Sequence, residues 1–242
     1  LLTWPDYPIH YRHRPAWARE AAPDLYFLCY RSPAAFGPRV KHEYLIPEHD
    51  PGPEQIKLNH VVHHGGIGHH VQNWHAFRAA SRVARMAAVD CASRIAIFSA
   101  GTMAEGWACY ATDLMSEVGF LTAPEQADER RTRARMAARA VVDIRLHQGR
   151  MTLEQAADFY QRQVGMPPTA ARNEAVKNSM FPGTALMYLL GTESIHQLRR
   201  DVASRLGSAF SLREFHDQFL SFGSIPVTLI AKAMLGSLDG TR

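Results

Sequence analysis

The distribution of proline constrains this 242-residue chain more than any other feature of its sequence. Nine of its 14 prolines lie in the first 53 residues, and prolines are scarce from Glu54 onward. Because proline lacks an amide hydrogen and interrupts helices and central strands, we expect residues 1–53 to form an irregular arm. Short strand or helix pieces are expected within it, at DLYFLCY (24–30) and KHEYLIP (41–47).

Apolar residues in the rest of the chain recur at intervals of three and four, the spacing of one face of an α-helix. Thr152 and Ser211 each stand three residues before a Gln or Glu, which is the spacing of a capping box. We therefore predict a mainly α fold, with one helical domain over residues 54–242 after the arm of residues 1–53. The segments with this pattern are 54–64, 68–89, 91–119, 124–148, 152–164, 168–178, 191–206 and 211–221.

Composition and charge argue against several classes of partner. The formal net charge is +4, and the densest basic group is flanked by acidic residues, which favours a solvated helix face over nucleic-acid binding. The apolar runs are too short or too often broken by charge to span a bilayer. No charged and then apolar leader opens the chain, and the three cysteines lack metal-type spacing, so we expect a cytoplasmic protein. The basic group consists of Arg130, Arg131, Arg133, Arg135 and Arg139.

Residues 60–75, HVVHHGGIGHHVQNWH, place six histidines around a glycine-rich centre. Neutral imidazole is the commonest side-chain metal ligand. On a regular helix His63 and His69 would point about 120° apart, at roughly 100° per residue. A break at the glycines of residues 65–68 would bring them together, since glycine tolerates unusual backbone angles. A helix–loop–helix junction with surface or capping histidines also fits this segment.

A third ligand is offered by GTMAEGWACY (101–110), where Glu105 stands in an otherwise apolar, small-residue helix. A buried carboxylate is costly unless it is paired or bound to a cation. A metal ion and a salt bridge would satisfy Glu105 equally well.

Together these segments resemble the bacterial domain-of-unknown-function 885 family, whose members are similar to zinc peptidases with a glutamate third ligand. HHGGIGHHVQ (63–72) matches the family's HExxPGHHxQ, and EGWACY (105–110) matches its EGWAxY. The resemblance covers about residues 26–235 and implies a gluzincin-like helical metallohydrolase half. Further matches, in the family's order, are DIRLHQGRMTLEQA (143–156), FPGTALMYLLG (181–191) and FSLREFHDQFLSFGSIPVTLI (210–230).

The resemblance implies that His63, His69 and Glu105 hold one divalent metal ion, zinc or iron, with His70 as the alternative to His69. It also implies polar residues that line the cleft, where tyrosine and histidine donors can stabilise an oxyanion that develops on the substrate. Alternatively, these residues are buried polar side chains that form hydrogen bonds with the backbone. The implied cleft residues are Arg145, His147 and Tyr188.

The sequence departs from the family pattern in two ways. His64 replaces the glutamate that acts as general base, and Ile67 replaces the proline. We therefore expect His64 to act as a proton shuttle or as an extra ligand, on a small non-peptide substrate. The match also covers only the C-terminal half of the family pattern. We expect a separate subunit with the N-terminal half, or a second copy of this chain, to cover the exposed helical face.

Three functions fit these features. The first is a metal-dependent enzyme that hydrolyses an amide or a related C–N or C–C bond with metal-activated water. The second is a non-haem iron oxygenase or lyase on the same ligands, since two histidines and one carboxylate also suit Fe(II). The third is a non-catalytic subunit with a degenerate metallopeptidase site.

Overall fold

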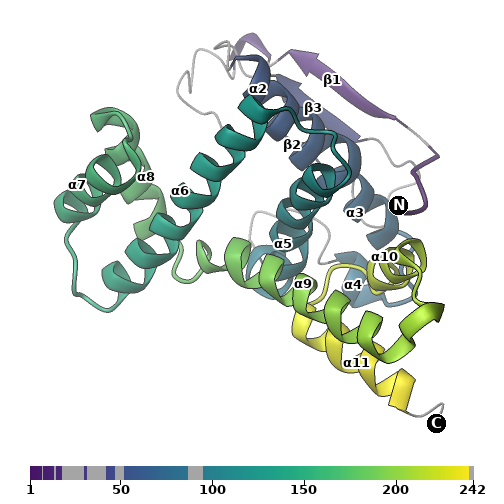
Figure 1. The fold of residues 1–242 in the computed structure, drawn as a ribbon. Coiled ribbons are helices and arrows are strands. Elements are labelled where there is room, and N and C mark those ends of the chain that lie inside the picture. The colour runs from purple at the N-terminus through teal and green to yellow at the C-terminus, as the bar shows by residue number, and fades with distance from the viewer. Residues whose placement is uncertain are drawn as a thin grey trace.

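The computed structural model describes residues 1–6, 8–13, 15–17, 30–31, 42–46, 52–86 and 95–239 of the chain. Most of this part is helical, which confirms the prediction of a mainly α fold (Figure 1). The helices are α2 (Pro53–Gln55), η1 (Ile56–His70), α3 (Val71–Ala76), α4 (Arg82–Met86), α5 (Ile95–Glu117), α6 (Ala123–His147), α7 (Leu153–Val164), α8 (Pro168–Ser179), α9 (Leu186–Leu206), η2 (Gly207–Ala209), α10 (Leu212–Ser221) and α11 (Val227–Asp239).

Several helix ends follow from the sequence and others do not. Thr152 and Ser211 are the N-caps of α7 and α10, and each side chain accepts a hydrogen bond from the amide three residues later. Helix α9 begins at Leu186 rather than at residue 191, because Gly191 lies inside the helix instead of before it. Helix α11 was not predicted, although its buried residues Val227, Ile230 and Met234 follow helical spacing.

A small three-stranded sheet packs against η1. Its strands are β1 (Ile9–His13), β2 (Tyr30–Arg31) and β3 (His42–Ile46). Strand β3 lies in the middle, parallel to β1 and antiparallel to β2. Strand β3 falls in the predicted piece 41–47, and β2 overlaps the predicted piece 24–30 only at Tyr30. Strand β1 was not predicted, because its side chains are mostly polar and exposed.

The core forms where α5 crosses α9, with Trp107 and Tyr110 among its fully buried side chains. At the crossing, Gly106 of α5 faces Gly191 of α9, and a Cβ on Gly106 would lie only 2.6 Å from the Cα of Gly191. The two backbones therefore touch directly. The hydroxyl of Thr192 donates a 3.4 Å hydrogen bond to the carbonyl of Gly106.

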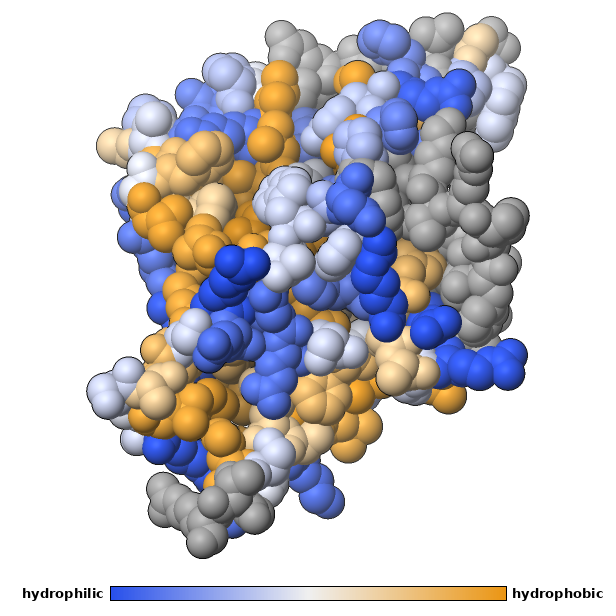
Figure 2. Space-filling view, turned by 90° about the vertical axis from the view of Figure 1, so that its right-hand side faces the viewer, coloured by the Kyte–Doolittle hydropathy of each residue, from blue (hydrophilic) through white to orange (hydrophobic). Residues whose placement is uncertain are grey.

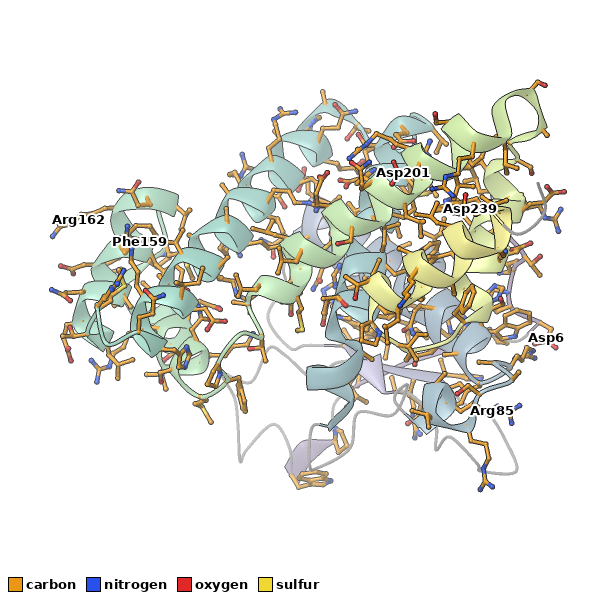
Figure 3. All side chains as sticks on the ribbon, turned by 90° about the horizontal axis from the view of Figure 1, so that it is seen from below. Asp6, Arg85, Phe159, Arg162, Asp201 and Asp239 are labelled. Atoms are coloured by element: carbon orange, nitrogen blue, oxygen red, sulfur yellow. The ribbon has the colours of Figure 1, made fainter. Side chains whose placement is uncertain are left out.

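Helices α7 and α8 form a hairpin that lies to one side, away from α10 and α11 in two perpendicular views (Figures 1 and 3). They pack on the second half of α6 through a separate apolar cluster around Val142, Tyr160 and Ala175. Phe159 and Arg162 mark this hairpin in Figure 3.

The arginines of α6 do not all form the predicted solvated face. Arg130, Arg131 and Arg135 are exposed. Arg133 and Arg139 turn inward instead, with side chains 23 % and 13 % exposed. The prediction was wrong for these two, because each meets a carboxylate on another helix: Asp113 of α5 for Arg133 and Glu174 of α8 for Arg139.

No helix in the described part of the chain is both long enough and apolar enough to cross a membrane. The face in Figure 2 carries apolar and hydrophilic side chains interspersed with one another.

The fold predicts an acid-sensitive core at His216. This ring is fully buried, where Nε2 lies 2.8 Å from the hydroxyl of Tyr110 and Nδ1 lies 2.8 Å from the carbonyl of Leu1. Burial lowers the pKa of His216 from 6.5 to about 4. Because the folded pKa is the lower one, this contribution to stability is complete above pH 6.5 and is lost as the pH falls towards 4.

We expect His216 to remove about 3 kcal/mol from the free energy of unfolding over that range, at about 1.4 kcal/mol per proton and pH unit. Urea unfolding at each pH measures it. His216→Gln should flatten the slope, and the exposed His10→Gln should leave it unchanged; equal slopes in all three proteins would contradict the assignment.

Candidate metal centre

The histidine segment is a helix interrupted at its glycines. In η1 the backbone leaves helical angles at Gly65, Gly66 and Gly68, where ψ is −122°, −109° and −123°. A Cβ on Gly65 would lie 2.7 Å from the carbonyl oxygen of His60, and a Cβ on Gly68 would collide with the carbonyl oxygen of His63. Only glycine fits these two positions, so the sequence dictates the break.

The break brings His63 and His69 together, with ring centroids 4.9 Å apart. Glu105 of α5 faces both: its Oε2 lies 3.3 Å from Nε2 of His63 and 3.4 Å from Nε2 of His69. The three side chains are between 10 % and 21 % exposed. Oε2 itself is buried and makes no hydrogen bond of good geometry. Such an atom is costly unless a cation accompanies it, and this donor set is one that zinc and Fe(II) accept.

The electrostatics of the site favour the protonation states that a metal ion requires. Burial alone would raise the pKa of Glu105, but the nearby His69 and His63 outweigh it and hold that pKa well below its ordinary value. Burial lowers the pKa of His63, against the opposing effect of Glu105. An ionised carboxylate and a neutral imidazole therefore face each other, and both are in the form that binds a divalent ion.

His64 belongs to the same cluster. His63, His64 and His69 each offer a ligand atom, and these atoms all lie within 4.8 Å of one another. Nδ1 of His64 lies 2.8 Å from the carbonyl oxygen of Asn59, which assigns the proton to Nδ1 and leaves Nε2 with a lone pair. Burial holds the pKa of His64 well below its ordinary value. His70 is buried but lies outside this group of three.

Trp107 fixes the broken segment to α5. Its indole Nε1 donates a 2.9 Å hydrogen bond to the carbonyl oxygen of Ile67, which lies between the glycines. The break leaves carbonyls of this turn without helical partners, and a buried carbonyl needs a donor. Trp107 supplies that donor from the same helix as Glu105, which it follows by two residues.

We expect Trp107→Phe to lower the free energy of unfolding by about 1–2 kcal/mol, because it leaves the Ile67 carbonyl without its donor. It should also weaken zinc binding by about tenfold, as loss of a supporting hydrogen bond does at metal sites. Chemical denaturation and zinc titration measure the two effects. The exposed Trp17→Phe is the control, and a Trp107→Phe protein with unaltered zinc affinity would exclude the supporting role.

The other predicted cleft residues lie in different surroundings. Tyr188 is on the first turn of α9, close enough for the charge of Glu105 to act on its pKa, which burial raises. Arg145 is exposed. Nδ1 of His147 lies 2.8 Å from the Asp143 carboxylate and its Nε2 lies 3.4 Å from the carbonyl oxygen of Ser179. The structure thus brings Tyr188 towards the cluster, and places Arg145 and His147 at the end of α6.

Asp143 has a structural role that the sequence did not predict. Its two carboxylate oxygens accept hydrogen bonds from the amides of Gly183 and Ala185, both at 2.9 Å. Asp143 therefore holds the turn that precedes α9. In the sequence, Asp143 stands at the start of the DIRLHQG segment. That position alone does not distinguish it from a surface aspartate on a helix.

A cavity of about 300 Å³ lies elsewhere, between α2 and the start of α6. Its lining contains none of the predicted site residues. It is lined by Glu54, Gln55, Pro124, Ala127, Asp128 and Arg131.

Two solved structures are similar to this fold. The putative lipoprotein from Colwellia psychrerythraea is 28 % identical, with a TM-score of 0.80 over 98 % of this chain. A putative lipoprotein of unknown function from Shewanella oneidensis is 22 % identical, with a TM-score of 0.75 over 97 % of this chain. The chain spans only 39 % and 42 % of the lengths of these two proteins. No functionally curated protein matches the chain.

These relatives overturn the expectation of a cytoplasmic location. Both are named as lipoproteins, which points to a membrane-anchored or secreted location. The cysteine spacing and the first residues of this sequence were weak grounds for predicting a location, because they say nothing about segments outside this sequence.

Residues 4–234 match the family described as a bacterial protein of unknown function, DUF885. The match covers nearly the whole chain and includes the broken histidine segment, the EGWACY segment and the DIRLHQG segment. The chain therefore belongs to the DUF885 family.

Proposed function

We propose that the chain is a metal-dependent enzyme that holds one divalent ion on His63, His69 and Glu105. The observation that carries this proposal is the buried, unbonded Oε2 of Glu105 between the two imidazole nitrogens. A zinc ion at this place would act as a Lewis acid and make water more acidic. The likeness to zinc peptidases, and the correspondence to the C-terminal half of a gluzincin-like fold, are part of the same proposal.

The reaction we propose is hydrolysis of an amide, or of a related C–N or C–C bond, in a small non-peptide molecule. His64 stands where the family pattern has its glutamate base, and its unprotonated Nε2 can accept a proton beside the other histidines. Tyr188 is the group near Glu105 that can donate a hydrogen bond to a substrate oxygen.

Two other functions have support of their own. Two histidines with one carboxylate are also the ligand set of non-haem Fe(II) oxygenases, which makes an iron oxygenase or lyase the second candidate. A histidine in place of the base is the observation behind the third, a non-catalytic subunit with a degenerate site.

Elemental analysis of protein purified without added metal separates these candidates. We expect about one zinc per chain, and we expect His63→Ala or His69→Ala to abolish it. Iron with oxygen-dependent turnover would favour the second candidate. If His64→Ala left the activity of the assembly unchanged, His64 would have no catalytic role, and the third candidate would gain.

We also propose a partner that covers the helices beside the site. Large apolar side chains are exposed on α6, on α8 and just after it, and on α9, and the similar solved proteins are more than twice as long as this chain. The cover is a subunit or segment equivalent to their remaining length, or a second copy of the chain. Light scattering that shows a well-behaved monomer would contradict this. The exposed apolar residues are Ile144, Val176, Met180 and Leu190.

The lipoprotein names of the similar structures support a location at a membrane surface or outside the cytosol. Fractionation of cells that express the whole protein tests this part of the proposal.

A further inference from the structure

Two tyrosines of the small sheet lie side by side against η1. Tyr11 of β1 is the register partner of Tyr44 of β3, and their ring centroids lie 5.6 Å apart. Side chains alternate between the two faces of a strand, so the neighbouring Arg12 and Glu43 lie on the opposite face, where a 2.9 Å ion pair joins them. The face that carries the two tyrosines is therefore the one that packs on the histidine segment.

Tyr11 supports the backbone at the break. Its hydroxyl donates a 3.3 Å hydrogen bond to the carbonyl oxygen of His60. A Cβ on Gly65 would collide with the same hydroxyl, so Tyr11 lies directly against the first glycine of the break. Tyr11 thus contacts main-chain atoms of η1, whereas Tyr44 contacts its imidazole rings.

Tyr44 is buried, with 1 % of its surface exposed. Its hydroxyl contacts Nδ1 of His60, and its ring meets the rings of His60 and His64 edge-on, at centroid distances of 5.0 and 5.5 Å. His60 and His64 are four positions apart in the helical part of η1, before the break, and so lie on one side of it. Tyr44 therefore contacts both imidazoles of that side.

His64 contacts the proposed ligands as well as Tyr44. Its ring centroid lies 4.7 Å from that of His63 and 5.3 Å from that of His69. Nδ1 of His64 lies 2.8 Å from the carbonyl oxygen of Asn59, which fixes one atom of the ring. One hydrogen bond does not fix the rotamer of a half-buried side chain, because rotamers that face the solvent compete with it. The contact with the Tyr44 ring supplies a second point of support.

We propose that Tyr44 is a positioning residue for His64: the edge of its ring holds the imidazole in one orientation, with Nδ1 on the Asn59 carbonyl. The inference rests on the proposed function, in which His64 accepts a proton, and adds a residue of the N-terminal sheet to that site. Nε2 carries the lone pair only while the proton stays on Nδ1, so the orientation of the ring decides which nitrogen accepts a proton. The small sheet is thereby part of the site.

Nitrogen-15 NMR of the imidazoles tests this in the metal-free chain at pH 8, where imidazole is neutral. Long-range proton–nitrogen spectra distinguish the two neutral tautomers, and the His64 signals are those that vanish in His64→Gln. We expect one tautomer in the unaltered chain, with the proton on Nδ1. Tyr44→Leu should average the His64 signals between both tautomers, because leucine fills much of the volume but has no ring edge. A single Nδ1-protonated tautomer in Tyr44→Leu would overturn the positioning role.

Tyr44→Phe is the conservative variant. It keeps the ring and removes the hydroxyl, so it should retain the single tautomer of His64 while it shifts the signals of His60. Tyr11→Leu is the matched control on the neighbouring strand, and it should leave the His64 tautomer unchanged because Tyr11 contacts the main chain. Loss of the single tautomer in either variant would show that the ring of Tyr44 is not what holds His64.

A second measurement does not depend on how the variants fold. The ring contact predicts nuclear Overhauser effects between the ring hydrogens of Tyr44 and His64 in the unaltered chain, and their absence would overturn the proposal. Zinc titration of the same samples reports the metal centre separately. A His64 tautomer that depends on Tyr44, in a chain that binds no zinc, would uphold the positioning role and reject the metal centre. Zinc binding by an unaltered chain whose His64 populates both tautomers would do the reverse.

Discussion

Glu105→Gln is expected to weaken zinc binding by about a hundredfold or more, since it removes a first ligand where loss of a supporting bond already costs ten- to a hundredfold. The substitution keeps the size of the side chain but replaces an anion with a neutral amide. In the metal-free protein it removes the carboxylate that faces His63 and His69. Competition with a chromophoric zinc chelator measures the affinity.

Glu193→Gln is the matched control, because Glu193 lies on α9 with its side chain 72 % exposed. It should bind zinc as the unaltered chain does. If Glu105→Gln kept full zinc affinity while His63→Ala lost it, the ion would lie on the three histidines alone. A zinc affinity that neither variant changes would refute the metal centre.

Gly68→Ala is expected to lower the free energy of unfolding by about 3 kcal/mol or more and to abolish zinc binding. A methyl group at this position collides with the carbonyl oxygen of His63, which is backbone and cannot rotate away. The segment must shift to admit it, and a shift moves His63 relative to His69. Denaturant unfolding and zinc titration test both effects.

Gly236→Ala controls for the substitution itself. A Cβ at Gly236 of α11 meets nothing within 4 Å, so this variant should be neutral or more stable by up to about 1 kcal/mol. A Gly68→Ala protein that unfolds and binds zinc like Gly236→Ala would show that the break does not depend on glycine.

The convergence of the site could be predicted from the sequence because its causes are local. His63 and His69 are only six positions apart, and the glycines between them allow a break in the helix. The approach of Glu105 depends on the packing of α5 against η1, where Trp107 bonds to the carbonyl oxygen of Ile67, and no local pattern predicts this contact. Its place in the site came from the family resemblance rather than from periodicity.

The inward turn of Arg133 and Arg139 could not be predicted for a related reason. On α6 alone they belong to a run of arginines that follows Asp128 and Glu129, which is typical of a solvated face. Their carboxylate partners Asp113 and Glu174 belong to other helices, and only the packing of α5 and α8 brings them into reach. His147 lies at the end of α6, where its Nδ1 contacts the carboxylate of Asp143 one turn earlier.

The direct backbone contact between α5 and α9 also bears on the entropy of ion binding. With no side chain between Gly106 and Gly191, the separation of the two helices is set by main-chain atoms that have no rotamers to sample. The main chain of Glu105, one residue before that contact, is thereby fixed when the chain folds. In the proposed metal centre, an ion would then order only the side-chain torsions of this ligand, and less conformational freedom would be lost.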